Sequence, residues 1–359
     1  MPTATAYAIT SPNTPLRQIT IARRDLRDDD LAVTVTHCGV CHSDLDAIRG
    51  YQGPSPLVPG HEFVGIVREI GAGVTHFVPG DRVAVGNIVD SCGVCDMCIA
   101  GQENYCREFP TLTYGGSDRQ DHTTTQGGYS SEYIVSERFA YSVPDDLDSA
   151  GVAPLMCAGI TVWEPLRRWS VGPGMAVGIV GLGGLGHLAV KFAAALGAEV
   201  TVFTTTAEKA REAARLGASR AVVSTRPDDM AAERGRHDFI LDTASGPHDL
   251  NPYFNALRLD GTLCTVGMSG QPQFDPLALL IGRKSLASAG SGGTIGTRQM
   301  LDFCADHGIA ADVEVLPLGQ VNTALERLGR GDVRYRFTLA IPESGVPPRR
   351  EPGVNGTAD

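Results

Sequence analysis

Four cysteines are concentrated in one short stretch, SCGVCDMCIAGQENYC. They are Cys92, Cys95, Cys98 and Cys106, so two residues separate each of the first three and seven separate the last pair. This spacing allows four thiolates to converge on one tetrahedral metal ion from a small loop. Because thiolates would fill every coordination position, we expect a structural zinc ion. The alternative is a pair of disulfides, which a reducing compartment disfavours, or chance cysteines in a loop.

Further candidates for metal ligation lie at three places along the chain. Cys41 lies in GVCHSD, His61 and Glu62 lie in PGHEF, and Cys157 lies in APLMCAGITVW. Taken singly, a buried cysteine, or a histidine after a Pro-Gly turn, is more often a packing residue than a ligand. Their occurrence together with the four-cysteine loop strengthens the interpretation as ligands.

A glycine-rich turn lies between two apolar runs in AVGIVGLGGLGHLAVKFAAALGAEVTVF, residues 176–203. Gly181 would permit the tight turn, Gly183 would let the backbone approach a phosphate, and Gly186 would let a helix pack closely on the preceding strand. The N–H groups of the helix N-terminus then face the anion. This order of strand, glycine turn, helix and strand predicts a dinucleotide-binding unit, and an ordinary βα turn is the alternative.

The pattern of apolar and turn-forming residues changes near residue 148, before that turn. From residue 7 to about 141, short β runs alternate with turn signals, which predicts a β-rich, barrel-like domain. After residue 148, strands alternate with Ala-rich helices, which predicts a doubly wound parallel sheet of six strands. We therefore expect a first domain over residues 1–157, a dinucleotide-binding domain over 158–293, a return to the first domain over 294–343 and a disordered tail over 344–359.

Composition narrows the class of partner. The chain has 359 residues and a formal net charge of -11, with no basic block, which argues against nucleic acid or an anionic membrane as the main partner. Its start, MPTATAYAIT, has neither a basic nor an apolar region of the kind found in signal peptides. We therefore expect a cytoplasmic protein that acts on a small molecule, in which the nine cysteines are ligands, thiols or core residues.

The ordered motifs resemble those of zinc-dependent medium-chain alcohol dehydrogenases, and within them the cinnamyl-alcohol-dehydrogenase-like group. GVCHSD, VPGHEFVGIV, the four-cysteine loop, TQGGYSSEYIV, PLMCAGITVW and GLGGLGH occur in the expected order, and the resemblance spans residues 7–342. It implies a β-rich GroES-like catalytic domain joined to a Rossmann domain. It also implies an enzyme that interconverts alcohols and aldehydes, with two zinc ions per chain, as a homodimer or homotetramer.

The resemblance also assigns roles near the catalytic zinc. It implies that Cys41, His61 and Cys157 hold this ion and leave a fourth position open, and that Glu62 can approach it. Asp44 would orient the imidazole of His61. Ser43 would pass on the proton of the alcohol. Many relatives continue this relay with a histidine where this chain has Asp46, so relay through Asp46 and transfer to water both stay open.

The same resemblance places residues around the cofactor. His42 would lie near the pyrophosphate and Thr161 near the nicotinamide. The turn itself would contribute Gly181, Gly183, Gly184, Leu185 and Gly186.

The choice of cofactor depends on the residues after the second strand. NAD sites usually place an acidic residue there, about 20 residues after the glycine turn. This chain has Thr204, Thr205 and Thr206, with Glu208 and Lys209 just after. We expect NADP(H), with the threonines and Lys209 on the 2′-phosphate. The open alternatives are helix capping by the threonines and ribose binding by Glu208.

Other functions remain possible on the same scaffold. One is NADPH-dependent reduction of conjugated C=C or iminium bonds, which some relatives perform after their relay residues change. Another is a non-catalytic nucleotide-binding protein, because fold does not determine function. A repurposed protein would be expected to lose Cys41, His61 or Cys157, and all three are present.

Overall fold

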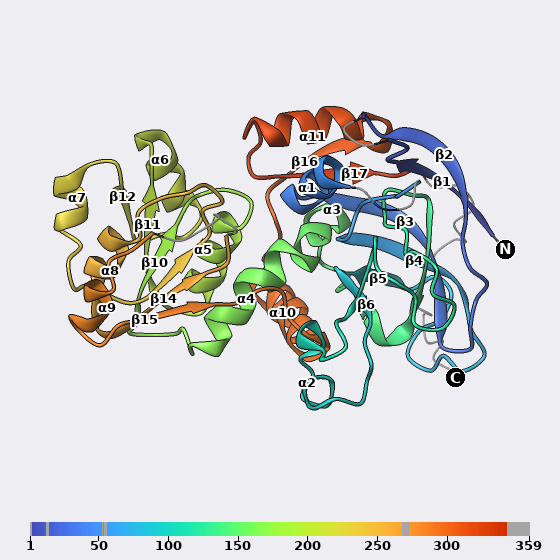
Figure 1. Cartoon of the computed structure of the whole chain (residues 1–359), viewed down its shortest axis with the longest axis horizontal. Coiled ribbons are helices and arrows are strands. Elements are labelled where there is room, and N and C mark those ends of the chain that lie inside the picture. The colour runs from blue at the N-terminus through green and yellow to red at the C-terminus, as the bar shows by residue number, and fades with distance from the viewer. Residues whose placement is uncertain (1, 12–13, 52, 54–55, 268–272, 343–359) are drawn as a thin grey trace, which may run out of the picture. The chain divides into compact units, whose positions relative to one another are not determined.

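The computed structural model describes residues 2–11, 14–51, 53, 56–267 and 273–342 (Figure 1). The chain divides into two compact units. The β-rich unit comprises Met1–Met156 and Val313–Asp359, and the parallel-sheet unit comprises Cys157–Asp312. The expected disordered tail, 344–359, lies outside the described residues.

The β-rich unit is built on a seven-stranded sheet. Its order is β16-β17-β3-β4-β5-β9, with β8 also paired to β3. Strand β3 is the centre: ten of its eleven residues are buried, and it pairs antiparallel with β4, β8 and β17. Two further two-stranded sheets, β1-β2 and β6-β7, belong to the same unit. The strands of the unit are β1 (Thr3–Ala8), β2 (Arg17–Ala22), β3 (Asp30–Val40), β4 (Phe63–Ile70), β5 (Arg82–Val85), β6 (Ile88–Asp90), β7 (Thr111–Leu112), β8 (Glu132–Ser136), β9 (Ala140–Ser142), β16 (Val313–Pro317) and β17 (Arg336–Ala340).

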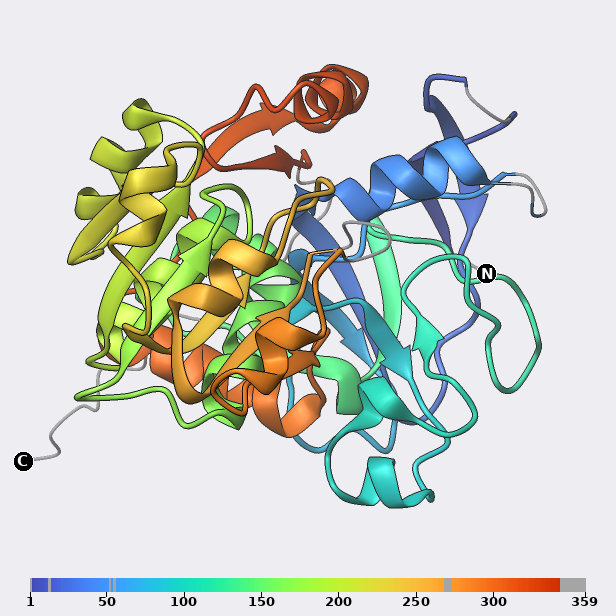
Figure 2. The same cartoon turned by 60° about the vertical axis from the view of Figure 1, so that its left-hand side comes forward.

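Short helices connect and cover these strands. Figure 2 shows α2 in a loop that extends from the edge of this unit. The helical segments are α1 (His42–Gly50), α2 (Asp96–Ile99), η1 (Glu103–Tyr105), η2 (Glu137–Phe139), α3 (Ser149–Val152), η3 (Ala153–Met156), η4 (Leu318–Gln320) and α11 (Val321–Gly329).

The parallel-sheet unit contains six strands in the order β12-β11-β10-β13-β14-β15, all parallel. The chain runs outward from β10 to β12 and then continues on the other side from β13 to β15. The order therefore reverses between β10 and β13, which is where ligands bind in open parallel sheets. The strands are β10 (Ala176–Val180), β11 (Glu199–Thr204), β12 (Arg220–Val223), β13 (His237–Asp242), β14 (Leu257–Thr265) and β15 (Ser285–Ser288).

Helices flank this sheet (Figure 1). They are α4 (Ala158–Arg168), α5 (Gly186–Ala195), α6 (Ala207–Arg215), α7 (Pro227–Ala231), α8 (Asn251–Ala256), α9 (Leu277–Leu280) and α10 (Thr294–His307). Within the described residues, no helix combines the length and apolar character needed to cross a bilayer.

The boundaries of the units differ from the expected domain limits by one residue at Cys157, which belongs to the parallel-sheet unit, and by more at the end of that unit. The sequence pattern places 294–343 in the return to the first domain, but the parallel-sheet unit continues to Asp312. The physical reason is helix packing, because α10 contacts α4 within that unit. Phe303 of α10 lies against Trp163 of α4, with ring centroids 4.8 Å apart.

Candidate active site

The dispersed candidates Cys41, His61 and Cys157 converge in the structure. One ligand atom from each lies within 4.8 Å of the others. Cys41 follows the end of β3 and precedes α1, and His61 precedes β4. Cys157 directly follows η3, whose last residue, Met156, lies against Gly86 of the same β-rich unit. Ligands of a tetrahedral zinc ion lie roughly 3.5–4 Å apart, so small side-chain movements would complete such a site.

A buried carboxylate orients the histidine of this group. Asp44 is fully buried. Its Oδ1 accepts hydrogen bonds from His61 Nδ1 at 3.0 Å and from the Gly60 N–H at 3.1 Å. Its Oδ2 accepts from the Cys41 N–H at 3.0 Å and from the Tyr129 hydroxyl at 2.9 Å. Because Nδ1 of His61 donates to Asp44, Nε2 is the nitrogen that can ligate a metal.

The same carboxylate controls the charge of the imidazole when no metal is bound. Burial lowers the pKa of His61, but the adjacent Asp44 outweighs burial and holds this pKa well above its ordinary value. Zinc requires the neutral imidazole, so metal binding would release this proton.

Two backbone segments approach closely beside His61. Gly60 has φ of +96°, and a Cβ at this position would lie 2.7 Å from the Tyr129 backbone nitrogen. Glycine therefore brings the Pro59-Gly60 turn against the segment that carries Tyr129. Arg23 anchors that segment, since its guanidinium donates to the Gly127 carbonyl at 2.8 Å and to the Ser130 hydroxyl at 2.5 Å. Burial lowers the pKa of Arg23 to about 10.

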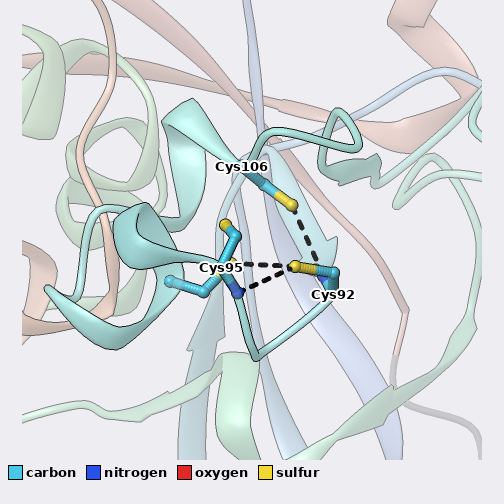
Figure 3. A group of neighbouring side chains, drawn as sticks. Cys92, Cys95 and Cys106 are labelled. Atoms are coloured by element: carbon cyan, nitrogen blue, oxygen red, sulfur yellow. Dashed lines mark hydrogen bonds between the residues drawn. The ribbon is translucent and has the colours of Figure 1, made fainter.

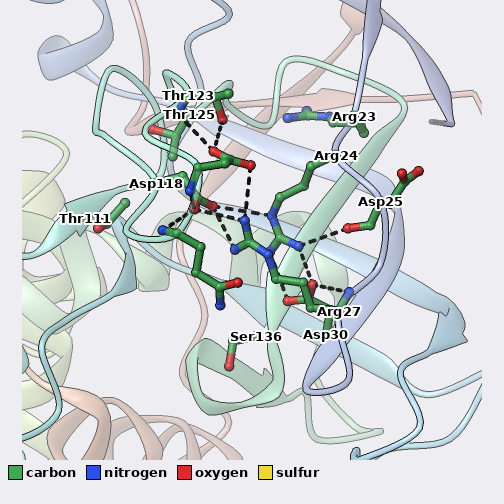
Figure 4. Close-up of polar contacts among 12 residues, drawn as sticks. Arg23, Arg24, Asp25, Arg27, Asp30, Thr111, Asp118, Thr123, Thr125 and Ser136 are labelled. Carbon is green, nitrogen blue, oxygen red and sulfur yellow. Dashed lines mark hydrogen bonds and ion pairs between the residues drawn. The ribbon is translucent and has the colours of Figure 1, made fainter.

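An ion cluster fastens the neighbouring loop (Figure 4). Arg27 binds both carboxylate oxygens of Asp118 at 2.9 Å, and Arg24 pairs with Asp30. Asp118 is partly buried; burial raises its pKa, but Arg27 and backbone N–H groups lower it to about 2. The cluster thus joins the loop around Asp118 to the segment that precedes β3.

Glu62 forms a second buried ion pair beside the same group. It is fully buried, and its Oε1 pairs with Arg336 of β17. Within the described residues its Oε2 has no hydrogen-bond partner. Burial raises the pKa of Glu62 to about 8, and the charge of Arg336 opposes this. An unpartnered buried carboxylate oxygen next to His61 fits a site that holds a cation.

The four cysteines of the loop converge as well. Their sulfur atoms all lie within 4.8 Å of one another, and the Cys92 and Cys98 sulfurs are 3.8 Å apart. That separation matches two ligands of one zinc ion and is far beyond a disulfide bond. Figure 3 shows Cys92, Cys95 and Cys106 turned toward one another. The residues present therefore fit a closed, four-thiolate zinc site.

Backbone N–H groups in this loop stabilise a thiolate. Backbone N–H groups of Arg107 and Cys98 lower the pKa of Cys95 to about 6. Cys95 precedes α2, so it lies at the N-terminal end of that helix. Burial raises the pKa of Cys98 to about 11, so this thiol depends most on a metal to lose its proton.

The glycine turn has the geometry required for a dinucleotide. Gly181 has φ of +88°, and a Cβ on Gly186 would lie 2.1 Å from the Gly181 carbonyl oxygen. A Cβ on Gly183 would meet nothing within 4 Å, so the exposed surface of the turn is open. Leu185 is the residue before α5, whose N-terminal N–H groups come directly after the turn. Of these three glycines, Gly183 thus leaves space that a ligand could fill.

The residues expected on the 2′-phosphate lie at the end of β11. Thr204 is buried, whereas Thr205 is exposed. Thr206 is the N-cap of α6, and its hydroxyl accepts a hydrogen bond from the Lys209 N–H at 3.3 Å. Helix capping, which the sequence left open as an alternative to phosphate binding, therefore occurs at Thr206. Lys209 is partly exposed in the first turn of α6, and Glu208 beside it is exposed.

Comparisons with known proteins agree with this geometry. Residues 27–145 match the family description "Alcohol dehydrogenase GroES-like domain", and residues 184–306 match "Zinc-binding dehydrogenase". The NADP-dependent alcohol dehydrogenase C of Mycobacterium bovis is 43% identical over 95% of this chain and 99% of its own length. The chain belongs to the zinc-binding alcohol dehydrogenases.

Solved structures of this family are similar over nearly the whole chain. The cinnamyl alcohol dehydrogenase SbCAD4 of Sorghum bicolor is 41% identical with a TM-score of 0.91, covering 94% of this chain and 98% of its own. The cinnamyl alcohol dehydrogenase of Helicobacter pylori, solved with NADP(H), is 32% identical with a TM-score of 0.87 and the same coverage. The fold of this alcohol dehydrogenase is therefore a GroES-like domain with a Rossmann domain, as the motifs predict.

The remaining predicted residues lie on two helices. Along α1 of this alcohol dehydrogenase, His42 is exposed and Ser43 is partly exposed, with Ser43 Oγ 3.7 Å from Cys41 Sγ. Asp46 is exposed. Thr161 lies in the first turn of α4, where its N–H donates to the Cys157 carbonyl.

Sequence reasoning missed two partners of the site, Tyr129 and Arg336. Tyr129 lies 85 residues from Asp44, and Arg336 lies 274 residues from Glu62. Tyr129 is part of the motif TQGGYSSEYIV, so the resemblance offered a signal for it. For Arg336 the only signal was a charged residue at the start of an apolar strand.

Proposed function

We propose that this chain is a zinc-dependent, NADP(H)-preferring alcohol dehydrogenase or aldehyde reductase that interconverts primary alcohols and aldehydes, including aromatic and allylic ones. The convergence of Cys41, His61 and Cys157 is the observation that carries this proposal. Family membership and similarity to cinnamyl alcohol dehydrogenases support it.

Two sites would hold zinc. Cys41, His61 and Cys157 would hold a catalytic ion with one open position, and Cys92, Cys95, Cys98 and Cys106 would hold a structural ion. When bound, the catalytic zinc supplies a Lewis acid for the substrate oxygen, and NADP(H) supplies or accepts a hydride. Asp44 would hold the tautomer and orientation of His61, and Glu62 would approach the ion in some states.

Ser43 would move the proton of the alcohol. Its hydroxyl lies 3.7 Å from a predicted zinc ligand, Cys41. Asp46, three residues further along α1, is exposed. Solvent surrounds an exposed side chain, so we favour transfer from Ser43 to water.

The cofactor pocket would use the glycine turn for the pyrophosphate and the residues after β11 for the 2′-phosphate. Exposed Thr205, capping Thr206 and the ammonium of Lys209 suit a phosphate. The N-terminus of α6 also favours an anion. Similarity to proteins described as NADP-dependent and as complexed with NADP(H) supports this choice.

Replacing Lys209 by alanine should shift cofactor preference. We expect the ratio of kcat/KM for NADPH to that for NADH to fall roughly tenfold or more, because a charge-assisted contact to the 2′-phosphate is lost. The control is Arg211→Ala, which removes an exposed cation from the same helix and should leave the ratio unchanged. A wild type that prefers NADH, or equal effects of both variants, would contradict the assignment.

A substrate screen tests the proposed reaction itself. NADPH- and NADH-dependent turnover is measured over aromatic, aliphatic and conjugated aldehydes, and the products are identified. We expect conjugated aldehydes to yield allylic alcohols with the C=C bond retained. Saturated products would favour the alternative, a reductase of conjugated C=C bonds. Absence of turnover with every class would favour a non-catalytic protein.

The assembly we infer is a homodimer through the edge of the parallel sheet. Strand β15 pairs only with β14 among the described residues. Three apolar residues nearby are exposed: Leu277 by 51%, Leu280 by 75% and Ile281 by 60%. A second copy would cover both the unpaired edge and this apolar surface. Sedimentation equilibrium should give twice the chain mass, and Leu280→Glu should shift it toward the monomer.

The compartment we infer is the cytoplasm. All nine cysteines lie in the described residues, and none of them forms a disulfide. Two sites that require thiolates suit a reducing compartment. Cell fractionation with an antibody to the native chain measures this directly.

A further inference from the structure

His187, the second residue of α5, is completely buried, and both of its ring nitrogens have polar partners. Nδ1 lies 3.1 Å from the carbonyl oxygen of Gly183, and Nε2 accepts a hydrogen bond from the backbone N–H of Asp312 at 3.3 Å. Because the amide can only donate, Nε2 is unprotonated and Nδ1 carries the proton. A neutral ring therefore connects the glycine turn to Asp312.

Asp312 ends the short segment by which the chain leaves the parallel-sheet unit, residues 309–312, called the exit segment here. Helix α10 ends just before it at His307, and the C-cap residue Gly308 has φ of +62°. Within the segment, Ile309 and Ala311 are buried. After Asp312 the chain continues directly into β16 of the β-rich unit.

Two cationic side chains bind the exit segment to helices of the parallel-sheet unit. Lys191 of α5 donates to the Ala310 carbonyl at 2.8 Å and to Asp312 Oδ1 at 2.5 Å. Arg215 of α6 donates to Asp312 Oδ2 at 3.1 Å. These contacts hold the segment independently of the glycine turn, whereas His187 contacts both.

We propose that His187 is a positioning residue that couples nucleotide binding at the glycine turn to the order of the exit segment. The inference rests on the proposed binding of NADP(H) at that turn. Gly183 has open space on its exposed side, and its carbonyl accepts from both the His187 N–H at 3.0 Å and the ring Nδ1. A pyrophosphate that fixes the turn thereby fixes the ring, and the ring holds the Asp312 amide.

Coupling of this kind is reciprocal. If nucleotide binding orders the exit segment, an ordered segment must raise nucleotide affinity by the same factor. Lys191 and Arg215 would then support affinity indirectly, and His187 would transmit their effect to the turn.

Hydrogen exchange measures the coupling without reference to turnover. In the full-length, zinc-loaded protein, exchange of the Asp312 amide is followed with and without saturating NADPH, and the Kd for NADPH is measured by fluorescence. Coupling free energies between protein sites typically correspond to factors of about 5–150. We expect NADPH to slow exchange in the wild type by roughly fivefold or more beyond the change at the Gly235 amide. That amide serves as the reference because it bonds to Asn255 elsewhere in the same unit.

Two variants separate the two hydrogen bonds. The amide of His187→Asn can replace Nδ1 but falls short of Asp312, and the amide of His187→Gln can reach Asp312 but loses the donor to Gly183. Both should lose the additional slowing, and both should bind NADPH more weakly. The control Lys191→Met should speed exchange of Asp312 in both states while the slowing by NADPH remains.

The possible results distinguish this inference from the proposed function. A wild type that binds NADPH, with both His187 variants retaining its additional slowing, would overturn the inference alone. A wild type that does not bind NADPH would refute the proposed cofactor, and the inference with it.

Discussion

Cys157→Ala should abolish turnover while leaving a folded protein with one zinc ion. Loss of an outer-shell partner of a metal ligand typically costs 10–100-fold in activity or affinity, so loss of a ligand should cost more. Cys157 is one of the three candidate ligands that converge at this site among the residues that the structure describes. Activity should fall below detection in both directions, and metal analysis should change from about two zinc ions per chain to about one.

A substitution in the four-cysteine loop should affect stability rather than catalysis. Cys95→Ala leaves Cys41, His61 and Cys157 in place, so catalysis per folded molecule should largely persist. The melting temperature of the variant should instead fall by about 10 °C. At about 2–4 °C per kcal/mol in a domain of this size, this fall corresponds to about 2.5–5 kcal/mol of lost stability. Normal activity in Cys157→Ala would show that the catalytic assignment is wrong.

Ser43→Ala should lower alcohol oxidation by roughly 10²–10⁴-fold, the typical contribution of a positioned acid–base group. The hydroxyl lies 3.7 Å from Cys41 Sγ on the first turn of α1, and alanine keeps that helix intact. The measurement is kcat for oxidation against pH, together with the Kd for NADPH, which should not change. Unchanged binding would separate a lost proton step from a misfolded site.

Asp46→Asn is the matched variant on the same helix. Asp46 is exposed, so water can take its place, and we expect less than about a threefold change in kcat. If the loss equalled that of Ser43→Ala, the proton would travel through Asp46 and our preference for water would be wrong.

The local motifs were legible from the sequence because their chemistry depends on short spacings. The four cysteines lie within one loop of 15 residues, 92–106, so their convergence needs little tertiary structure. Gly181 and Gly186 are likewise explained by the turn they share, and the apolar run that opens residues 176–203 forms β10. The alternating strands and helices of the second half also predicted the parallel sheet.

The supports of the site were decided by contacts between residues distant in sequence. Glu62 meets Arg336 because β17 pairs with β3, and Asp44 meets Tyr129 because Gly60 lets two backbone segments approach. The hydrophobic periodicity of the sequence does not predict such contacts, because each depends on the order of the strands in the folded sheet.

Residue type and local spacing were therefore enough to predict the four-cysteine loop and the glycine turn, whereas the ligand roles of Cys41, His61 and Cys157 came from the resemblance to a family. The tertiary structure decided which residues hold them and where the units divide. Helix α10 shows the difference, because an aromatic contact between Phe303 and Trp163 keeps it in the parallel-sheet unit. His187 shows it too: its burial and its contact with Asp312, 125 residues away, exist only once the chain has folded.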